Sequence, residues 1–260
     1  MNTIETILEK IERAKELDFG SIFSESIELF KKTWVQGLLL QLFTFAIMLP
    51  VLLIFYVPFI GAIIAQQESG YADPNAMEGV FASMSILYIL ALIVCILVLG
   101  AVSVALNAAF FRIMRKLDSN EQNTTSDFFY FLKGEYLKKT FVIMLISIVI
   151  AIPAALLCYI PLIYAIVPLS FFSIFFAFNP ELSVGDIVKA SFKLGNKKWL
   201  IAFGLIIVSS ILAQLVGMLL CGIGVLVTAP FVYHPIYLIY KKVIGISEKS
   251  EIDTIGSREL

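Results

Sequence analysis

The chain is organised around the stretch from Lys138 to Glu181, which reads KKTFVIMLISIVIAIPAALLCYIPLIYAIVPLSFFSIFFAFNPE. The 41 residues from Thr140 to Pro180 contain no Asp, Glu, Lys or Arg. Because roughly 20 apolar residues in a helix cross a bilayer core about 30 Å thick, this run is long enough for two spans. The residues Cys158-Tyr159-Ile160-Pro161 lie at its middle and indicate a turn. The stretch therefore predicts a transmembrane hairpin.

The composition of the whole chain is typical of a membrane protein. Of its 260 residues, 60% are hydrophobic and only 15% are charged, and the mean hydropathy is +0.93. Soluble domains carry about 25% charged residues. The three cysteines, Cys95, Cys158 and Cys221, all lie in apolar runs, which indicates packing residues rather than disulfides. The chain has no metal-ligand spacing of Cys and His, so we expect no metal and no cofactor.

The first 33 residues predict two amphipathic helices. They are dense in charge, which does not fit a cleaved signal peptide with an early apolar core. Apolar residues recur at helical spacing up to Leu17, and Asp18-Phe19-Gly20-Ser21 interrupts the pattern. A second helix is expected near residues 22–32, ending at Lys31-Lys32.

Three more uncharged regions flank the central hairpin, two before it and one after it. The regions 33–67 and 79–111 predict a first hairpin with an acidic loop, whose turn signal is Asp73-Pro74-Asn75. Pro50 should kink its first helix. The region 199–240 predicts a third hairpin that turns at Cys221-Gly222-Ile223-Gly224. The expected spans are roughly 34–57, 83–111, 141–159, 161–178, 199–220 and 223–240.

The sequence therefore predicts an all-α fold. We expect a polytopic membrane helical bundle of about six transmembrane helices in three hairpin repeats, with amphipathic cytoplasmic helices. One of these helices should cover residues 124–139, ahead of the central hairpin. Residues 1–33 would form the N-terminal amphipathic helices, 34–242 the six-span transmembrane domain, and 243–260 a flexible cytoplasmic tail.

A basic pair opens each proposed repeat. Lys31-Lys32, Lys138-Lys139 and Lys197-Lys198 are each followed within two residues by an aromatic residue and a long apolar run. A spacing of eight residues also recurs, between Pro50 and Pro58, Pro153 and Pro161, and Gly222 and Pro230. These matches favour a triplication. The alternative is that basic pairs simply flank membrane helices in general.

The distribution of charge predicts the orientation. In a six-span arrangement all 19 Lys and Arg fall on the side of the two termini, together with 17 of the 20 acidic residues. Cytoplasmic loops are enriched in Lys and Arg, and this enrichment does not depend on how many acidic residues the loops contain. We therefore expect a multi-pass protein of the bacterial inner membrane with both termini in the cytoplasm.

The expected spans carry no formal charge, which argues against a proton relay or a voltage sensor. Gln41, Asn107 and Gln214 could bond across helices or line a polar site. His234 is expected to be an ordinary interfacial histidine, and a pH sensor is the alternative. No serine elbow, phosphate loop or paired acids in an apolar setting occur, so we expect no enzyme.

One region resembles a known membrane-domain family. The segment Ser183-Val184-Gly185-Asp186-Ile187-Val188-Lys189-Ala190-Ser191-Phe192, followed by Lys197-Lys198-Trp199, is similar to the membrane domain found beside glycerophosphodiester phosphodiesterases and to its uncharacterised bacterial relatives. The resemblance covers residues 179–240 best. It implies a six-span bundle and no particular activity. The phosphodiesterase domain itself is absent, so its catalysis is not implied.

Two classes of function follow for the chain. The first is an accessory or scaffold role, in which amphipathic helices lie at the membrane interface and the basic pairs contact anionic lipid head groups or a protein partner. The candidate contact residues are Lys31, Lys32, Lys138, Lys139, Lys197 and Lys198. The second is a transporter of a small solute or lipid. No nucleic-acid partner is expected, and the oligomeric state is left open. The basic pairs could also serve only to set the topology.

Overall fold

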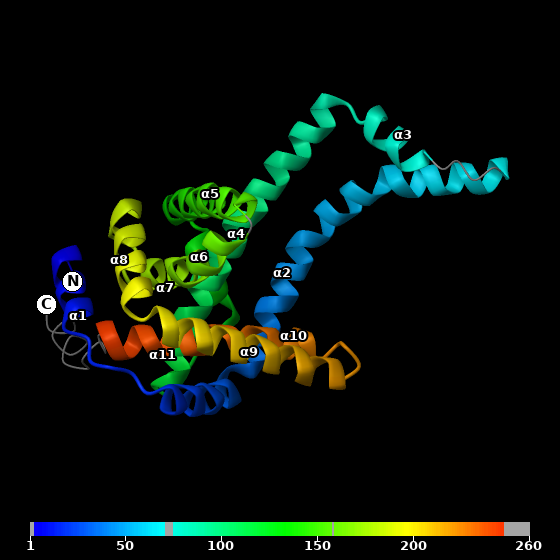
Figure 1. Ribbon diagram of the computed structural model, residues 1–260. Helices are drawn as coiled ribbons and strands as arrows, with labels where there is room; N and C mark the ends of the chain where they lie inside the picture. Colours follow the sequence, from blue (N-terminus) through cyan, green and yellow to red (C-terminus); the bar gives the residue numbers. More distant parts are fainter. Residues whose placement is uncertain (1–2, 71–74, 158, 247–260) are drawn as a thin grey trace, which may run out of the picture.

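The computed structural model describes residues 3–70, 75–157 and 159–246, and within these ranges it contains helices and no strand (Figure 1). Five of the described helical segments are long and apolar enough to cross a membrane. They are Phe19–Glu68, Ile86–Asp118, Gly134–Leu156, Ile160–Phe178 and Trp199–Leu219. The predicted all-α, bundle-type membrane fold is confirmed.

The N-terminal region contains α1 (Ile4–Glu12) and the long helix α2 (Phe19–Ser69). The Asp18 carboxylate caps α2 by accepting from the Ser21 backbone N–H at 2.6 Å. The predicted helix end at Lys31-Lys32 is wrong, because α2 continues through the pair into the first span. Lysine is a good helix former, so a basic pair can mark a membrane boundary without ending a helix.

The first hairpin consists of α2, α3 (Ala76–Ser83) and α4 (Ile86–Asp118), and its tip projects far from the other helices (Figure 1). The expected turn at Asp73-Pro74 lies outside the described residues. The helix α2 changes direction in its outer half, the half that contains Pro50 and Pro58 (Figure 1). The bend agrees with the predicted kink, since proline lacks the N–H for a helical hydrogen bond.

The second hairpin begins with the 3₁₀ helix η1 (Thr125–Leu132), and α5 (Gly134–Leu156) follows it directly. The single amphipathic helix predicted over 124–139 is therefore wrong. The predicted turn is confirmed, since α5 ends at Leu156 and α6 (Ile160–Ser170) begins just after Tyr159, which has φ 63°. The helix α7 (Phe172–Phe178) completes the return.

The fourth predicted span is divided between α6 and α7, close to Pro168. Pro168 cannot donate to the Tyr164 carbonyl four residues earlier. That carbonyl instead accepts from the Trp199 indole Nε1 at 3.1 Å. The neighbouring helix therefore satisfies the backbone group that the proline leaves free, as a membrane interior requires.

The third hairpin is entered from α8 (Val184–Lys197) and consists of α9 (Trp199–Leu219), α10 (Val225–Thr228), the 3₁₀ helix η2 (Ala229–Val232) and α11 (Tyr233–Ile244). Its predicted turn is confirmed, with Cys221 at φ 58° and Gly222 at φ 79°. The span predicted over 223–240 is not one continuous helix, because this return is built from three consecutive helical pieces. Pro230 and Pro235 lie in it and remove backbone donors. The count of six spans stays a prediction.

Many of the largest buried side chains lie in the returning arm of a hairpin, and Phe128 and Phe131 of η1 are fully buried as well. The returning arms are the second half of α4, α7 and α11. The Phe175 ring of α7 meets the Tyr240 ring of α11 at 5.0 Å, and the Phe111 ring of α4 meets the Tyr233 ring at 5.7 Å. The arms thus converge on one core, whose largest members include Phe110, Phe111, Phe172, Phe175, Phe176, Tyr237 and Tyr240.

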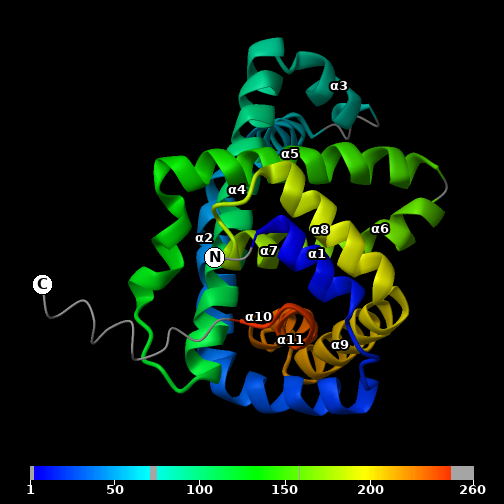
Figure 2. The same cartoon turned by 90° about the vertical axis from the view of Figure 1, so that its left-hand side faces the viewer.

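The short helices α1 and α8 lie side by side at one end of the bundle, where they contact each other (Figure 2). Ile7 and Ile11 of α1, and Ile187 and Leu194 of α8, have no exposed surface. Their apolar faces are therefore buried in the protein. This differs from the expectation that such helices lie on the membrane, because an apolar face that is covered by protein is no longer offered to lipid.

Candidate functional site at the charged end of the bundle

The first basic pair is exposed on α2. The Lys31 Nζ pairs with Glu28 Oε1 at 2.6 Å, one turn earlier on the same helix. The Lys32 Nζ donates to Asn120 Oδ1 at 3.4 Å. Trp34 follows directly and is 44% exposed. An exposed lysine pair beside an exposed tryptophan is typical of a helix at a membrane–water boundary.

The second pair has two different environments. The Lys139 Nζ donates to the carbonyl oxygens of Pro180 at 2.5 Å and Leu182 at 3.3 Å, just beyond the end of α7. Lys138 is exposed, and no hydrogen bond or ion pair reaches its ammonium from the described part of the chain. Adjacent residues of a helix point about 100° apart, so one lysine stabilises the fold and the other stays free.

The third pair binds the segment that follows α1. The Lys197 Nζ donates to the carbonyl of Glu12, the last residue of α1, and the Lys198 Nζ donates to the Lys15 carbonyl at 2.5 Å. Carbonyls at a helix C-terminus have no partner within the helix and carry partial negative charge. Lys198 is 8% exposed, and its burial, together with the Lys197 charge, lowers its pKa against the opposing effect of Glu16.

The six lysines therefore divide into two groups. Lys139, Lys197 and Lys198 donate to backbone carbonyls, although Lys197 is also exposed, whereas Lys31, Lys32 and Lys138 are exposed and donate to no backbone carbonyl in the described part of the chain. Within the described ranges, no bond joins one pair to another. Their contact with lipid head groups or a partner stays a prediction.

Asp118 joins the first and third hairpins in a way that the sequence did not indicate. Its Oδ2 accepts from the Tyr237 hydroxyl at 2.9 Å and from the Lys241 Nζ at 2.6 Å. The nearby Lys242 Nζ pairs with Glu25 Oε1 at 2.8 Å. Asp118 is the last residue of α4, and its neighbours in the sequence do not indicate these partners. The pairing depends on α4 and α11 meeting at their charged ends.

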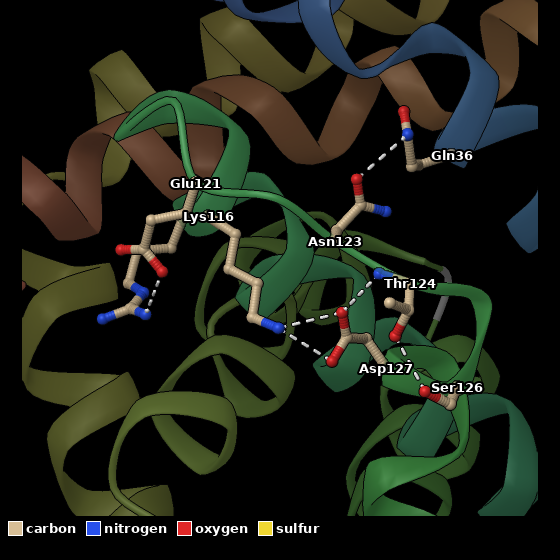
Figure 3. Close-up of polar contacts among 8 residues, drawn as sticks. Gln36, Lys116, Glu121, Asn123, Thr124, Ser126 and Asp127 are labelled. Atoms are coloured by element: carbon tan, nitrogen blue, oxygen red, sulfur yellow. Dashed lines mark hydrogen bonds and ion pairs between the residues drawn. The ribbon is translucent and has the colours of Figure 1, made fainter.

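The corner between α4 and η1 is a second polar cluster (Figure 3). The Lys116 Nζ lies 2.8 and 2.9 Å from the two carboxylate oxygens of Asp127. The same carboxylate accepts from the Thr124 backbone N–H at 2.9 Å and so completes a capping box. Burial alone would raise the pKa of Asp127, but the hydrogen bonds from Lys116 and Thr124 outweigh it and lower the pKa.

Asp127→Asn is expected to lower the free energy of unfolding by about 1–2 kcal/mol, because it removes a charge-assisted bond and weakens a cap. The measurement is thermal unfolding in mild detergent. Since the folded pKa is lowered, the stabilisation is present above the ordinary carboxyl pKa and is lost as the pH falls below about 4.

The matched control for that change is Glu121→Gln. Glu121 pairs with Arg115 at 3.4 Å and its side chain is 49% exposed, so the loss should stay below about 0.5 kcal/mol. Equal losses in the two variants would contradict the assigned role of Asp127.

A surface hollow of about 430 Å³ lies between α1 and the end of α11. Its ionisable lining residues are four cations and one carboxylate, namely Lys10, Arg13, Lys15, Lys242 and Glu9. The Lys10 Nζ also donates to the Ile244 carbonyl at 2.8 Å, and Arg13 pairs with Glu9 at 2.6 Å. The hollow therefore has an excess of positive charge, part of which binds the protein itself.

His234 lies inside the bundle and not at an interface, so that prediction is wrong. Its Nδ1 is 3.2 Å from the carbonyl oxygens of Pro230 and Phe231, and Pro235 leaves the Phe231 carbonyl without its helical donor. Carbonyls only accept, so Nδ1 carries the proton. The Nε2 lies 2.7 Å from the Thr33 hydroxyl, which also donates to the Leu29 carbonyl at 3.0 Å. The histidine joins α2 to the third hairpin.

Comparison with protein-family models, curated proteins and solved structures finds no match to this chain. Among the described residues, no group of three or more His, Cys, Asp and Glu side chains could hold a metal ion.

Proposed function

We propose that this integral membrane protein has an accessory, non-enzymatic role. In this role its exposed lysines Lys31, Lys32 and Lys138 contact anionic lipid head groups. In this proposal it crosses the bacterial inner membrane several times with both termini in the cytoplasm. A protein partner with an acidic surface is the other occupant that the same lysines could accept. The resemblance of residues 179–240 to the membrane domain of glycerophosphodiester phosphodiesterases remains a prediction consistent with such a role.

The observation that carries the proposal is the position of exposed lysines next to exposed apolar side chains. Lys31 and Lys32 are followed by Trp34, and Lys138 lies one turn from Val142, which is 41% exposed. In water such apolar surface is unfavourable, whereas at the edge of a bilayer it faces acyl chains. The adjacent ammonium groups then lie at the level of the head groups, where anionic lipids attract them.

The broken helices of this protein argue against the transporter alternative. Discontinuous membrane helices of transporters present free backbone groups to substrate or ions. Here the Tyr164 carbonyl freed by Pro168 accepts from Trp199, and the Phe231 carbonyl freed by Pro235 accepts from His234. These two breaks are satisfied within the protein, so the groups are not available to a transported ligand.

Two triple variants test the proposal, with each removing three positive charges. The variant with Lys31→Gln, Lys32→Gln and Lys138→Gln removes the three lysines of the pairs that are exposed and bound to no backbone carbonyl among the described residues. It should lower the anionic lipid retained in mild detergent severalfold, since each juxtamembrane lysine contributes about 1 kcal/mol. Native mass spectrometry measures the retained lipid, after a check that the variant inserts as the parent does.

The matched control combines Lys139→Gln, Lys197→Gln and Lys198→Gln. These lysines donate to backbone carbonyls, so their loss should lower thermal stability and leave lipid retention close to that of the parent. If the first variant retains as much anionic lipid as the parent, the lysine pairs serve only to set the topology, and the proposed role is refuted.

A further inference from the structure

A groove of about 510 Å³ lies between α4 and α5. Beside it the two helices come close together at Gly100, where an added Cβ would lie 3.3 Å from the Met144 side chain. The volume falls within the range of roughly 300–1,000 Å³ that is usual for small-molecule sites. Lys138 is the one ionisable residue in the lining, which consists of Val98, Ala101, Gly134, Leu137, Lys138, Phe141 and Val142.

The Lys138 charge at the groove has no bonded partner among the described residues. In the described part of the chain, no carboxylate or carbonyl bonds to the Lys138 ammonium, whereas the neighbouring Lys139 is held by two carbonyls. The closest other charges in the sequence are Lys133, whose Nζ lies 5.6 Å from the Tyr130 ring centroid, and the exposed Glu135. The groove therefore offers one free cation in an otherwise apolar lining, with Gly134 and Leu137 before it on α5 and Phe141 and Val142 after it.

The position of Lys138 along α5 matches a lipid in one leaflet. Lys138 and Lys139 are the last charges before the uncharged run from Thr140 to Pro180, so they mark the head-group level of this helix. Phe141 and Val142 follow within one turn, inside that run, and Val98 and Ala101 belong to the uncharged run of α4. Phe141 and Val142 thus lie on the bilayer side of Lys138, as the acyl chain of a phospholipid lies relative to its phosphate.

We propose that this groove binds one molecule of an anionic phospholipid, with an acyl chain against Val98, Ala101, Phe141 and Val142 and its phosphate at Lys138. The inference rests on the proposed function and assigns one site and one ligand class to it. A single flexible chain fits the groove better than a partner helix. A helix about 10 Å wide would need a longer apolar surface than these two short segments offer.

Photo-crosslinking tests the site directly. The full chain is reconstituted into bilayers of phosphatidylcholine that contain a trace of either phosphatidylglycerol or phosphatidylcholine with a diazirine in the acyl chain. After irradiation, mass spectrometry maps the adducts. We expect adducts on peptides containing residues 98–101 and 137–142, with phosphatidylglycerol favoured about fivefold over phosphatidylcholine, as one lysine near the surface provides.

Three variants distinguish the contribution of the Lys138 charge from the contribution of the shape of the groove. Lys138→Gln should bring the phosphatidylglycerol preference at these peptides close to one. Lys189→Gln, which removes from α8 an exposed lysine that bonds to no described residue, should leave the preference unchanged. Ala101→Leu should fill the groove and reduce adducts of both lipids. Val142→Trp narrows the groove at its exposed rim and replaces that variant if Ala101→Leu does not fold.

Two results would overturn the inference, namely adducts spread evenly over the lipid-facing helices, or a preference unchanged by Lys138→Gln. The proposed function is tested separately, by the anionic lipid that the Lys31→Gln and Lys32→Gln variant retains. If Lys31→Gln and Lys32→Gln still lower the retained anionic lipid, the charged end contacts lipid elsewhere and only the groove assignment fails. If neither they nor Lys138→Gln change it, both fail.

Discussion

Val149→Arg is expected to prevent proper insertion of the second hairpin, although Val149 is 69% exposed. Val149 lies 11 residues after Lys138 on α5, which is about 16 Å along the helix and roughly half of a bilayer core. Arginine at mid-membrane costs about 2.5–3.5 kcal/mol on insertion scales. The measurement is the amount of membrane-inserted protein, compared with the parent at equal expression.

The effect distinguishes a lipid-facing surface from a water-facing one. At an exposed position of a soluble protein, the same change would alter stability by no more than about 0.5 kcal/mol. Val149→Leu is the matched control and should insert as the parent does. Normal levels and normal insertion of Val149→Arg would contradict the placement of α5 across the membrane.

Phe175→Ala is expected to lower the free energy of unfolding by about 3–5 kcal/mol. Phe175 has no exposed surface and lies on α7, where the returning arms of the three hairpins converge. Its ring contacts the Tyr240 ring edge-on at 5.0 Å. Truncation leaves a cavity in a core that cannot close without moving three helices. Unfolding by a denaturing detergent, followed by circular dichroism, measures the loss.

Phe55→Ala is the matched control for the core. Phe55 lies in the projecting outer half of α2 and is 37% exposed, so its loss should change stability by about 1 kcal/mol or less. Similar losses in the two variants would mean that the three arms do not form the shared core.

The fold class and two of the turns could be read from the sequence, because both depend on local composition. A run of 41 uncharged residues needs lipid or protein around it wherever it lies, and Cys221-Gly222-Ile223-Gly224 forms a turn from its own residues. The exact ends of the helices could not be predicted from the sequence. The helix α2 continues through Lys31-Lys32, and the last return is divided around Pro230 and Pro235, since neighbouring helices can satisfy freed backbone groups.

The candidate site was only partly accessible to sequence reasoning. The lysine pairs were visible as charges beside apolar runs, but the bonds of Asp118 to Tyr237 and Lys241 join residues more than one hundred positions apart. Nothing local to Asp118 indicates which helix it meets. The pairing follows from how the ends of α4 and α11 pack.

The sequence by itself determined that this is a helical membrane protein with a charged end, since hydropathy and the placement of Lys and Arg are properties of the chain. Only the tertiary structure decided which apolar side chains form the core. Phe55 and Phe175 lie in equally apolar helices, and lipid and protein interior accept both alike, so no periodicity separates them. The tertiary structure also decided that Lys139 is bound to backbone carbonyls and that Lys138 is free. Adjacent side chains of a helix point in different directions and therefore meet different neighbours.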